Sequence, residues 1–580
     1  MNKEKITATK AIFECLLEQD VDTIFGYPGG SILNLYDELY RYQDKITHVL
    51  TAHEQGASHA ADGYARATGK VGVCFATSGP GMTNLTTGIA TAYMDSSPVV
   101  FITCNVGENL LGKDSFQEVD STGIAMPITK ATYLVRDPNL LVDSIRQAFA
   151  VAASGRPGPV LVDILKTVTL PSVLVDYEFI PWQENRSCHS IQAYNHSHGL
   201  KAPEPNKEDV AKLASMIQEA EKVMVISGGG VVRSRAKKEI TALAEWLQCP
   251  TATTVMGAGG FSGKHPLFTG MVGMHGSEAS NFAVVECDLL LVVGGRFSDR
   301  VALNPATFAK QAKIVQIDID RAEIDKNVVT DHHIIGSARK VLAALLAVLP
   351  KEGKAQSDWT KNILAKRRPT PFEPQTKGIT PQQVLEIVAH TAPEETVVAT
   401  DVGQHQMWSI QHFRFTYEGQ LLTSGGFGTM GFGLGAAIGA KIGCPEKVVV
   451  HTTGDGCFRM NCHELSTVEY YKLPIITIIF NNGALGMVRQ WQNLIYDKRF
   501  SSTDLMERSP DFVKLAEAYG VNGVRVTTAE EMQQALEKAL ASDKATVIDV
   551  VIHEDAMVRP MVAAGSEITA FLLGEETDYG

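Results

Sequence analysis

Two oxygen-bearing side chains stand at the ends of neighbouring apolar segments in the last third of the chain. Asp455 lies in a Gly-Asp-Gly turn after the apolar run 447–453, and Asn482 follows the β-rich run 473–480. Helical spacing of apolar residues over 461–471 predicts a strand, a turn, a helix and a second strand. The carboxyl ends of parallel strands meet at one edge of a sheet, where ligands bind. Carboxylate and amide oxygens suit Mg²⁺, and glycines let a diphosphate approach the backbone, so we predict a magnesium–diphosphate site.

The Gly-Asp-Gly turn by itself is more typical of a solvated loop, and the Asn-Asn pair makes it specific. Their spacing resembles the fingerprint of thiamine-diphosphate enzymes, which also need a carboxylate. Glu54, after the apolar run 48–51, is the candidate. A carboxylate bonded to the aminopyrimidine ring stabilises its imino tautomer, whose nitrogen takes the proton from the reactive carbon. An isolated glutamate is usually a cap or salt-bridge partner, so this prediction depends on both motifs occurring together.

The composition is that of a multidomain globular protein. A chain of 580 residues is too long for one domain, and its net charge of −13 is spread without a basic block, which argues against nucleic acid or an anionic membrane as a partner. Nine scattered cysteines without metal-ligand spacing favour a reducing compartment. Since we find neither a signal-peptide core nor a membrane-spanning apolar run, we expect a cytoplasmic protein without a membrane partner.

Alternating helical and β-rich runs predict an α/β protein with three doubly wound parallel-sheet domains. The middle domain has two glycine-rich strand ends and an acidic one, which suit a nucleotide cofactor, although Gly-x-Gly-x-x-Gly is absent. The predicted boundaries are 1–170 for an N-terminal domain, 171–205 for a linker, 206–350 for the middle domain, 351–379 for a second linker, 380–555 for the magnesium–diphosphate domain and 556–580 for a tail.

Over nearly its whole length the sequence resembles the catalytic subunits of the acetohydroxyacid synthase (acetolactate synthase) family, of the anabolic, flavin-containing type. The matching stretches, in family order, are Phe25-Gly-Tyr-Pro-Gly-Gly30, His53-Glu-Gln-Gly-Ala57, Thr77-Ser-Gly-Pro-Gly81, Asp114-Ser-Phe-Gln-Glu118, Ser154-Gly-Arg-Pro-Gly-Pro159, Gly273-Met-His-Gly276, Arg296-Phe-Ser-Asp-Arg300, Asp401-Val-Gly-Gln-His-Gln406, Gly428-Thr-Met-Gly-Phe-Gly433 and Gly486-Met-Val-Arg-Gln-Trp491. The resemblance implies three domains of the thiamine-diphosphate enzyme type, binding the pyrimidine, the flavin and the diphosphate in that order.

The resemblance also implies a thiamine site shared between subunits. Glu54 would reach the cofactor across a subunit interface, Met430 would hold it bent, and Asp455, Asn482 and the carbonyl of Ala484 would bind Mg²⁺. Without the motif, Met430 would be ordinary core packing and His405 a surface residue. The implied contacts of thiamine diphosphate are Tyr27, Pro28, Gly29, Glu54, Pro80, Asn84, Val402, Gly403, Gln404, His405, Gly428, Met430, Gly454, Asp455, Gly456, Cys457 and Asn482.

For the substrates, the resemblance implies that Gln117 and Lys166 act beside Glu54 at the reacting centre. Arg300 would pair with the carboxylate of the second 2-oxo acid through its planar guanidinium. Trp491 would favour 2-oxobutanoate, with packing between helices as the alternative interpretation of this residue. Phe116, Met487 and Val488 would complete the pocket wall. Lys166 departs from the family pattern, because Leu165-Lys166-Thr167 replaces Pro-Lys-Asp.

The implied flavin is FAD in a structural, non-redox role, because the reaction involves no net oxidation. Ser298 stands where the family has aspartate, which bears on flavin affinity. The implied FAD contacts are Arg156, Gly228, Gly229, Gly230, Thr254, Met256, His275, Gly276, Gly294, Arg296, Asp318 and Ile319.

The implied activity is decarboxylation of pyruvate and transfer of the hydroxyethyl group to a second 2-oxo acid. Pyruvate as acceptor gives 2-acetolactate and 2-oxobutanoate gives 2-aceto-2-hydroxybutanoate, the first common step towards valine, leucine and isoleucine. A homodimer or dimer of dimers and a small regulatory subunit are the implied partners. The alternatives are a pyruvate oxidase-like enzyme, a flavin-free catabolic acetolactate synthase and an inactive regulatory relative. The last would be expected to lack Glu54 or the metal ligands.

Overall fold

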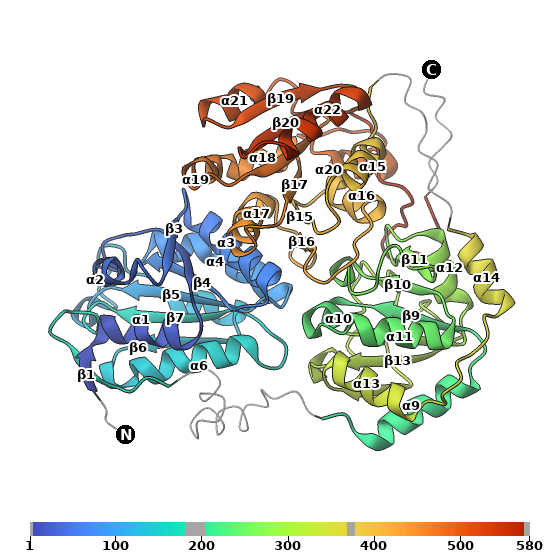
Figure 1. The fold of residues 1–580 in the computed structure, drawn as a ribbon, viewed down its shortest axis with the longest axis horizontal. Helices are drawn as coiled ribbons and strands as arrows, with labels where there is room; N and C mark the ends of the chain where they lie inside the picture. The colour runs from blue at the N-terminus through green and yellow to red at the C-terminus, as the bar shows by residue number, and fades with distance from the viewer. Residues whose placement is uncertain (1–3, 181–203, 368–377, 573–580) are drawn as a thin grey trace.

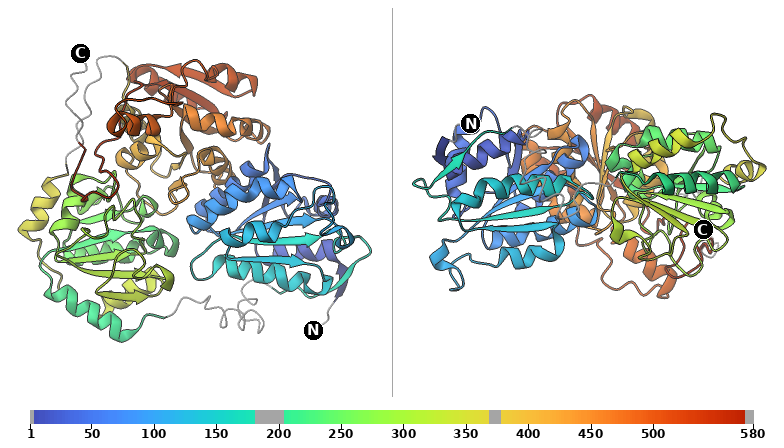
Figure 2. Two further views of the ribbon diagram at one scale, coloured as in Figure 1. Left: turned by 180° about the vertical axis from the view of Figure 1, so that it is seen from behind. Right: turned by 90° about the horizontal axis from the view of Figure 1, so that it is seen from below.

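The computed structural model describes residues 4–180, 204–367 and 378–572. Three parallel sheets of six strands each, flanked by helices, form three α/β units (Figure 1). The first unit (blue to cyan) and the middle unit (green) lie side by side, and the third (orange to red) lies against both (Figures 1 and 2). The predicted fold class is therefore confirmed.

The first unit contains a short antiparallel pair, β1 with β8, beside its main sheet, which has the order β3-β2-β4-β5-β7-β6. Its elements are β1 (Glu4–Thr7), α1 (Ala8–Glu18), β2 (Thr23–Gly26), α2 (Leu33–Leu39), β3 (Thr47–Leu50), α3 (Glu54–Thr68), β4 (Gly72–Thr77), α4 (Pro80–Met94), β5 (Val99–Asn105), α5 (Ser121–Ala125), β6 (Ala131–Val135), α6 (Leu141–Ala153), β7 (Val160–Leu165) and β8 (Leu174–Tyr177).

The middle sheet has the order β11-β10-β9-β12-β13-β14, in which the strand sequence reverses between β9 and β12. This is the order of dinucleotide-binding folds, whose ligand crosses the sheet at the reversal. The elements are α9 (Lys207–Glu219), β9 (Val223–Ser227), α10 (Gly229–Ser234), α11 (Lys237–Leu247), β10 (Thr251–Thr253), β11 (Phe268–Met271), α12 (Glu278–Glu286), β12 (Leu289–Val293), β13 (Lys313–Asp318), β14 (His332–Ile335), α13 (Ala338–Val348) and α14 (Asp358–Ala365).

The third sheet, β16-β15-β17-β18-β20-β19, repeats the strand order of the first. In each of these two sheets the order of the strands along the chain reverses at one point, between β2 and β4 in the first and between β15 and β17 in the third. The carboxyl ends of these strand pairs therefore form equivalent crevices. The elements are α15 (Pro381–Thr391), β15 (Val397–Thr400), α16 (Gln404–His412), β16 (Leu421–Thr423), α17 (Phe432–Gly443), β17 (Val449–Gly454), α18 (Asp455–Asn461), α19 (Leu465–Tyr470), β18 (Ile475–Asn481), α20 (Gly486–Ile495), α21 (Phe512–Ala518), β19 (Asn522–Val526), α22 (Ala529–Leu540) and β20 (Thr546–Val551).

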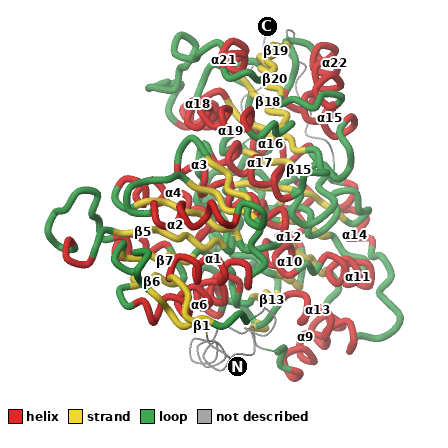
Figure 3. The backbone as a smooth tube through the Cα atoms, turned by 60° about the vertical axis from the view of Figure 1, so that its left-hand side comes forward, coloured by secondary structure: helices red, strands yellow, loops and turns green. Residues whose placement is uncertain are grey.

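Helices α3 and α17 join the first and third units through a close crossing of small residues. A Cβ placed on Gly63 would lie 2.5 Å from the Cα of Ala436, and one on Gly439 would lie 2.7 Å from the carbonyl carbon of Ala60. The two backbones therefore touch directly. A single apolar cluster continues across this contact, with Phe432 of α17 and residues of both sheets buried in it. Figure 3 shows the two helices crossing between the units.

Three segments differ from the sequence-based expectation. A short helix, α18, begins at Asp455 itself, followed by a 3₁₀ turn (Cys462–Glu464) and α19, where one helix over 461–471 was predicted. Strand β8 lies inside the predicted linker 171–205, because Val175 and Tyr177 alternate with exposed residues and pair with β1. Helix α14 lies inside the second predicted linker. Residues 181–203 of the first linker and 368–377 of the second fall outside the described residues.

The tail packs on the middle unit. Val562 is fully buried in the apolar cluster of that unit, and its N–H bonds to the carbonyl oxygen of Met274 at 2.8 Å. Within the described ranges, no helix combines the length and the apolar composition that crossing a membrane requires. The eight described cysteines are all free thiols, and seven of them are buried.

Candidate active site

The crevice between β15 and β17 gathers the predicted diphosphate residues. The turn after β15 carries Val402 and Gly403 into α16, which starts at Gln404 and His405. The turn after β17 brings Gly454 beside His405, because a Cβ on this glycine would lie 3.1 Å from the imidazole Nδ1. The thiol of Cys457 donates to the carbonyl oxygen of Val402 at 3.1 Å and so ties the two turns together. The structure thus brings these predicted residues to one edge.

Asp455 is buried with one carboxylate oxygen unsatisfied. The residue is 1% exposed, and its Oδ2 has no hydrogen-bond partner among the described residues. Burial raises the pKa of Asp455 to about 7. A buried carboxylate oxygen without a partner is costly unless a cation or a donor completes it. The Nε2 of His405 is also buried and unpartnered, and burial lowers the pKa of this imidazole to about 4. Both groups fit a charged ligand at this edge.

Asn482 faces the same crevice from the end of β18. Its side-chain Nδ2 donates to Oε1 of Gln404 at 3.3 Å, and its Oδ1 accepts from the buried N–H of Ala484 at 3.3 Å. No group of three or more His, Cys, Asp or Glu side chains gathers as a metal site in the part of the chain that the structure describes. The predicted set needs only one such residue, because an amide and a backbone carbonyl provide the other oxygens.

The loop between β16 and α17 closes this crevice from one side. Met430 reaches Gly456, where a Cβ would lie 3.9 Å from its methyl group. Gly428 is exposed, has a φ of +73°, and lies against Val402. The loop therefore brings Met430 and Gly428 to the turns after β15 and β17.

Asp401 is a residue that sequence reasoning named only within a motif. Its carboxylate accepts hydrogen bonds from Thr453 at 2.7 Å, His451 at 3.1 Å and the N–H of Gly433 at 2.8 Å. Burial opposes ionisation, but these bonds outweigh it and lower the pKa of Asp401 to about 2. The ionised carboxylate thus fixes β17 and α17 around the turn that leads to Gln404.

Glu54 starts helix α3 in the first unit. The residue is largely buried, and its Oε2 accepts from the side-chain amide of Asn84 at 2.9 Å. The helix itself is capped by His53, whose imidazole Nδ1 accepts from the N–H of Gln55 at 3.1 Å.

Sequence reasoning missed the group that holds the two residues before this helix. Glu464 of the third unit accepts from the N–H groups of Ala52 and His53, both at 3.1 Å, so a carboxylate from another unit holds the two residues that lead into α3. No local pattern could have revealed a contact over more than 400 residues.

The remaining first-unit candidates surround the crevice between β2 and β4. Tyr27 and Pro28 are exposed, Gly29 packs on Thr77, and Pro80 is exposed at the start of α4. These four residues and Asn84 lie in the turns after β2 and β4 or in the first turns of α4, so the structure brings them together with Glu54.

Gln117 and Lys166 lie on loops above the same crevice. Gln117 has a φ of +60° and packs its backbone on Gly79, while the neighbouring Phe116 is 88% exposed. The Nζ of Lys166 donates to the carbonyl oxygen of Gly30 at 3.1 Å. Among the described residues, no hydrogen bond or ion pair joins either side chain to Glu54.

The predicted acceptor residues lie where the middle and third units meet. The side chain of Arg300 is 61% exposed, and within the described chain it pairs with Asp299 at 3.3 Å. Trp491 of α20 packs on the apolar cluster of the middle unit, as does Val301. Met487 instead packs on the third sheet, and Val488 is half exposed.

The predicted flavin residues gather at the strand reversal of the middle sheet. The glycines after β9 and β12 touch each other, since the N–H of Gly230 bonds to the carbonyl oxygen of Gly294 at 2.8 Å. Near them lie two buried polar atoms without a described partner, Oγ of Ser227 and Oε1 of Gln316, and burial raises the pKa of Asp318 to about 6. These groups fit a polar ligand crossing the sheet.

The other predicted flavin residues lie around this reversal, and two of them, both arginines, already bond to other residues of the chain. Arg156 pairs with Asp320 and Glu323 at 3.2 and 2.9 Å, and Arg296 donates to the carbonyl oxygen of Met94 at 2.9 Å. The remainder are distributed as follows: Gly228 and Gly229 open α10, Thr254 bonds through its N–H to Ser227, Met256 packs on Gly229 and Gly425, His275 faces Pro560, Gly276 closes the turn begun by Gly273, and Ile319 follows β13 half-buried.

Comparisons with known proteins agree with this geometry. Three family models match: the N-terminal TPP binding domain of thiamine pyrophosphate enzymes over residues 6–124, the central domain over 210–345 and the C-terminal TPP binding domain over 401–550. A probable acetolactate synthase large subunit of Methanocaldococcus jannaschii is 45% identical over 97% of this chain and 94% of its own length. Acetolactate synthase large subunits of Cyanidium caldarium and Corynebacterium glutamicum are 42% and 44% identical, over 98% and 97% of this chain and 96% and 89% of theirs.

Proposed function

The chain belongs to the thiamine-diphosphate enzymes, among the acetolactate synthase large subunits. We propose, from the geometry of its site, how it carries out the acetolactate synthase reaction. The enzyme decarboxylates pyruvate and transfers the resulting two-carbon unit to a second pyruvate or to 2-oxobutanoate. Similarity of 40–45% over nearly the full chain carries this conclusion. The unpartnered carboxylate oxygen of Asp455, in the matched C-terminal TPP binding domain, supports it in the structure.

Asp455, Asn482 and the carbonyl of Ala484 hold Mg²⁺ in this proposal, and Gln404 and His405 contact the diphosphate. Bound thiamine diphosphate supplies a nucleophilic carbon for the 2-oxo acid carbonyl and an electron sink for the loss of carbon dioxide. Burial of Asp455 strengthens its attraction for a cation, because little water competes. The domains proposed for the pyrimidine end, 1–170, for FAD, 206–350, and for the diphosphate, 380–555, keep their order, and β8 and α14 extend the first two.

Glu54 holds or releases a proton at its carboxylate in this proposal. Asn84 fixes one oxygen at 2.9 Å, which leaves the second oxygen for the aminopyrimidine ring. The side chain of Glu54 contacts Asn84 and lies against Gly81, both in the first unit, whereas Asp455 belongs to the third. We therefore propose that Glu54 serves the site of a second subunit, which makes a homodimer the smallest active form; a dimer of dimers is built from the same contact.

The acceptor 2-oxo acid meets Arg300 in this proposal. Its guanidinium is largely exposed and has only a neighbouring surface aspartate, so a substrate carboxylate can replace that partner. Trp491, Met487, Val488 and Phe116 wall the pocket, and Gln117 and Lys166 approach the reacting carbon. FAD occupies the strand reversal of the middle sheet as a structural group. The relatives are large subunits, which supports a small regulatory partner, and the free buried thiols support a cytoplasmic location.

Product analysis tests the function. With pyruvate, Mg²⁺ and thiamine diphosphate, we expect 2-acetolactate, detected as acetoin after acidification, and with 2-oxobutanoate present we expect the mixed product as well. Asp455→Ala should abolish both, whereas Asp358→Ala, which removes an exposed carboxylate at the start of α14, should keep them. Oxygen uptake with formation of acetate or acetyl phosphate would instead establish a pyruvate oxidase.

A further inference from the structure

Three arginine side chains donate hydrogen bonds to the turn between α4 and β5, residues 94–97. Arg296 donates to the carbonyl oxygen of Met94 at 2.9 Å, and Arg156 donates to Oγ of Ser96 at 2.8 Å. Arg233 of α10 reaches the carbonyl oxygen of Asp95 at 3.2 Å and Oγ of Ser97 at 3.0 Å. The turn therefore binds the middle unit through Arg233 and Arg296. Neither the thiamine motifs nor the substrate residues include it.

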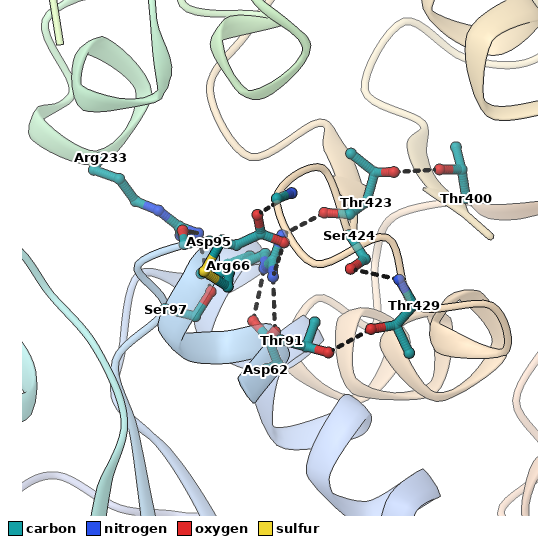
Figure 4. Close-up of polar contacts among 12 residues, drawn as sticks. Asp62, Arg66, Thr91, Asp95, Ser97, Arg233, Thr400, Thr423, Ser424 and Thr429 are labelled. Carbon is teal, nitrogen blue, oxygen red and sulfur yellow. Dashed lines mark hydrogen bonds and ion pairs between the residues drawn. The ribbon is translucent and has the colours of Figure 1, made fainter. Parts of the chain in front are cut away.

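The side chain of Asp95 connects this turn to the third unit. Its Oδ1 accepts from the N–H of Gly426 at 2.8 Å, and its Oδ2 accepts from Arg66 at 3.2 Å (Figure 4). Arg66 in turn donates to both oxygens of Asp62 at 2.6 and 2.7 Å, and to the carbonyl oxygen of Thr423 at 2.6 Å. Asp95 and Arg66 thus hold two points of the loop between β16 and α17.

The same loop has a third anchor near its other end. Oγ1 of Thr91 lies 2.7 Å from Oγ1 of Thr429, and the N–H of Thr429 bonds to Oγ of Ser424 at 3.0 Å. Between these anchors, residues 425–428 are exposed, and Met430 follows directly. The loop that carries Gly428 and Met430 is therefore positioned by α3, α4 and the 94–97 turn of the first unit, and not by its own sheet alone.

The charges of this junction are balanced. Two carboxylates, Asp62 and Asp95, face two guanidiniums, Arg66 and Arg233, and the side chains of Asp62, Asp95 and Arg66 are at most 3% exposed. Burial raises the pKa of Asp95, whereas in Asp62 the contacts with Arg66 outweigh burial and lower the pKa. Removing one partner from a buried ion pair leaves a charge uncompensated, so each charged side chain of this junction depends on its partner.

We propose that Asp95 is a positioning residue for the cofactor: through Gly426 and Arg66 it holds the 424–430 loop in the place where Gly428 and Met430 meet thiamine diphosphate. The inference rests on the proposed function, because it needs the cofactor at this loop. A purely structural junction would stabilise the protein without changing its affinity for the cofactor. A positioning junction contributes to both stability and affinity, because a loop that has lost its anchors must be ordered again when the cofactor binds.

Direct binding distinguishes these two roles. The dissociation constant of thiamine diphosphate is measured by calorimetry with saturating Mg²⁺, and hydrogen exchange is followed in peptides covering 424–430. Asp95→Asn keeps an acceptor for Gly426 but removes the charge that Arg66 meets, so we expect about tenfold weaker binding and faster exchange in the loop. Thr91→Val removes the hydrogen bond to Thr429 without removing a charge, and we expect the affinity for thiamine diphosphate to fall about threefold.

The matched control is Glu18→Gln, which breaks a buried ion pair with Arg146, at 2.9 and 2.6 Å, between α1 and α6 of the same unit. It should lower the urea midpoint as Asp95→Asn does, but leave the dissociation constant within about twofold of the original protein. Binding by Asp95→Asn and Thr91→Val within the same twofold range would overturn the proposal, and Thr91→Val alone decides if Asp95→Asn does not fold. A protein that binds no thiamine diphosphate before mutation refutes the proposed function instead.

Discussion

Gly439→Ala probes the α3–α17 crossing with a single methyl group. The new Cβ would lie 2.7 Å from both the carbonyl carbon of Ala60 and the backbone nitrogen of Tyr64. The carbonyl oxygen of Ala60 would lie closer still. Ordinary contacts between such atoms are about 3.5 Å, so the helices must separate by more than about 1 Å. No rotamer change relieves the contact, because both partners are backbone atoms.

Two opposing energies determine the effect on stability. Overpacking of this kind costs about 1–3 kcal/mol, and replacing glycine by alanine inside a helix returns about 1 kcal/mol. We therefore expect the free energy of unfolding to fall by only about 1–2 kcal/mol. The effect on catalysis should be larger, because α3 begins at Glu54 and the 424–430 loop leads into α17. A displacement of about 1 Å at a catalytic group can reduce the rate by about a hundredfold.

The assay compares acetolactate formation with urea unfolding. We expect kcat/KM to fall by at least about tenfold in Gly439→Ala while the protein stays folded at 25 °C. Lys212→Ala is the control, since this side chain is exposed on α9 of the middle unit and its loss should leave both quantities near their original values. If Gly439→Ala kept full activity while a structure showed the helices apart, the reasoning that this crossing fixes Glu54 would be refuted.

Three further changes test other parts of the molecule. Burial raises the pKa of Asp318 to about 6, so ionisation of this carboxyl opposes folding as pH rises from about 4 to above 6. Asp318→Asn should therefore add up to about 3 kcal/mol to the free energy of unfolding at pH 8 and little at pH 4. Equal gains in urea titrations at both pH values would contradict this. Glu464→Ala leaves the N–H groups of Ala52 and His53, just before α3, without their acceptor, so we expect a loss of about 1–3 kcal/mol in urea unfolding and faster hydrogen exchange over 52–56. Unchanged exchange would show that Glu464 does not hold this segment. Asp455→Asn should abolish the rise in Tm that Mg²⁺ and thiamine diphosphate give together, and a preserved rise would place the metal elsewhere.

Local patterns predicted the parallel sheets, the glycine turns and their chemistry, because strand periodicity and turn residues act over a few positions. The turns carrying Asp455 and Asn482 were predicted correctly as neighbours at one edge of a sheet. The start of α18 was missed, since Gly-Asp-Gly is as compatible with a loop as with the first turn of a helix. The contacts of Asp95 with Gly426 and of Glu464 with Ala52 span hundreds of residues, and both join separate units. Only the packing of those units creates them.

The bonds from Glu464 to the segment before α3 also constrain how this sequence can change over time. The Glu464 carboxylate occupies the space that a side chain at position 56 would fill, since a Cβ on Gly56 would lie 3.0 Å from its Cγ and closer still to its carboxyl atoms. Neither residue can be replaced alone without harm. A larger residue at 56 collides with the carboxylate, and losing Glu464 leaves the N–H groups of Ala52 and His53 without their acceptor. We therefore expect the two positions to vary together among relatives, with glycine at 56 retained wherever glutamate stands at 464.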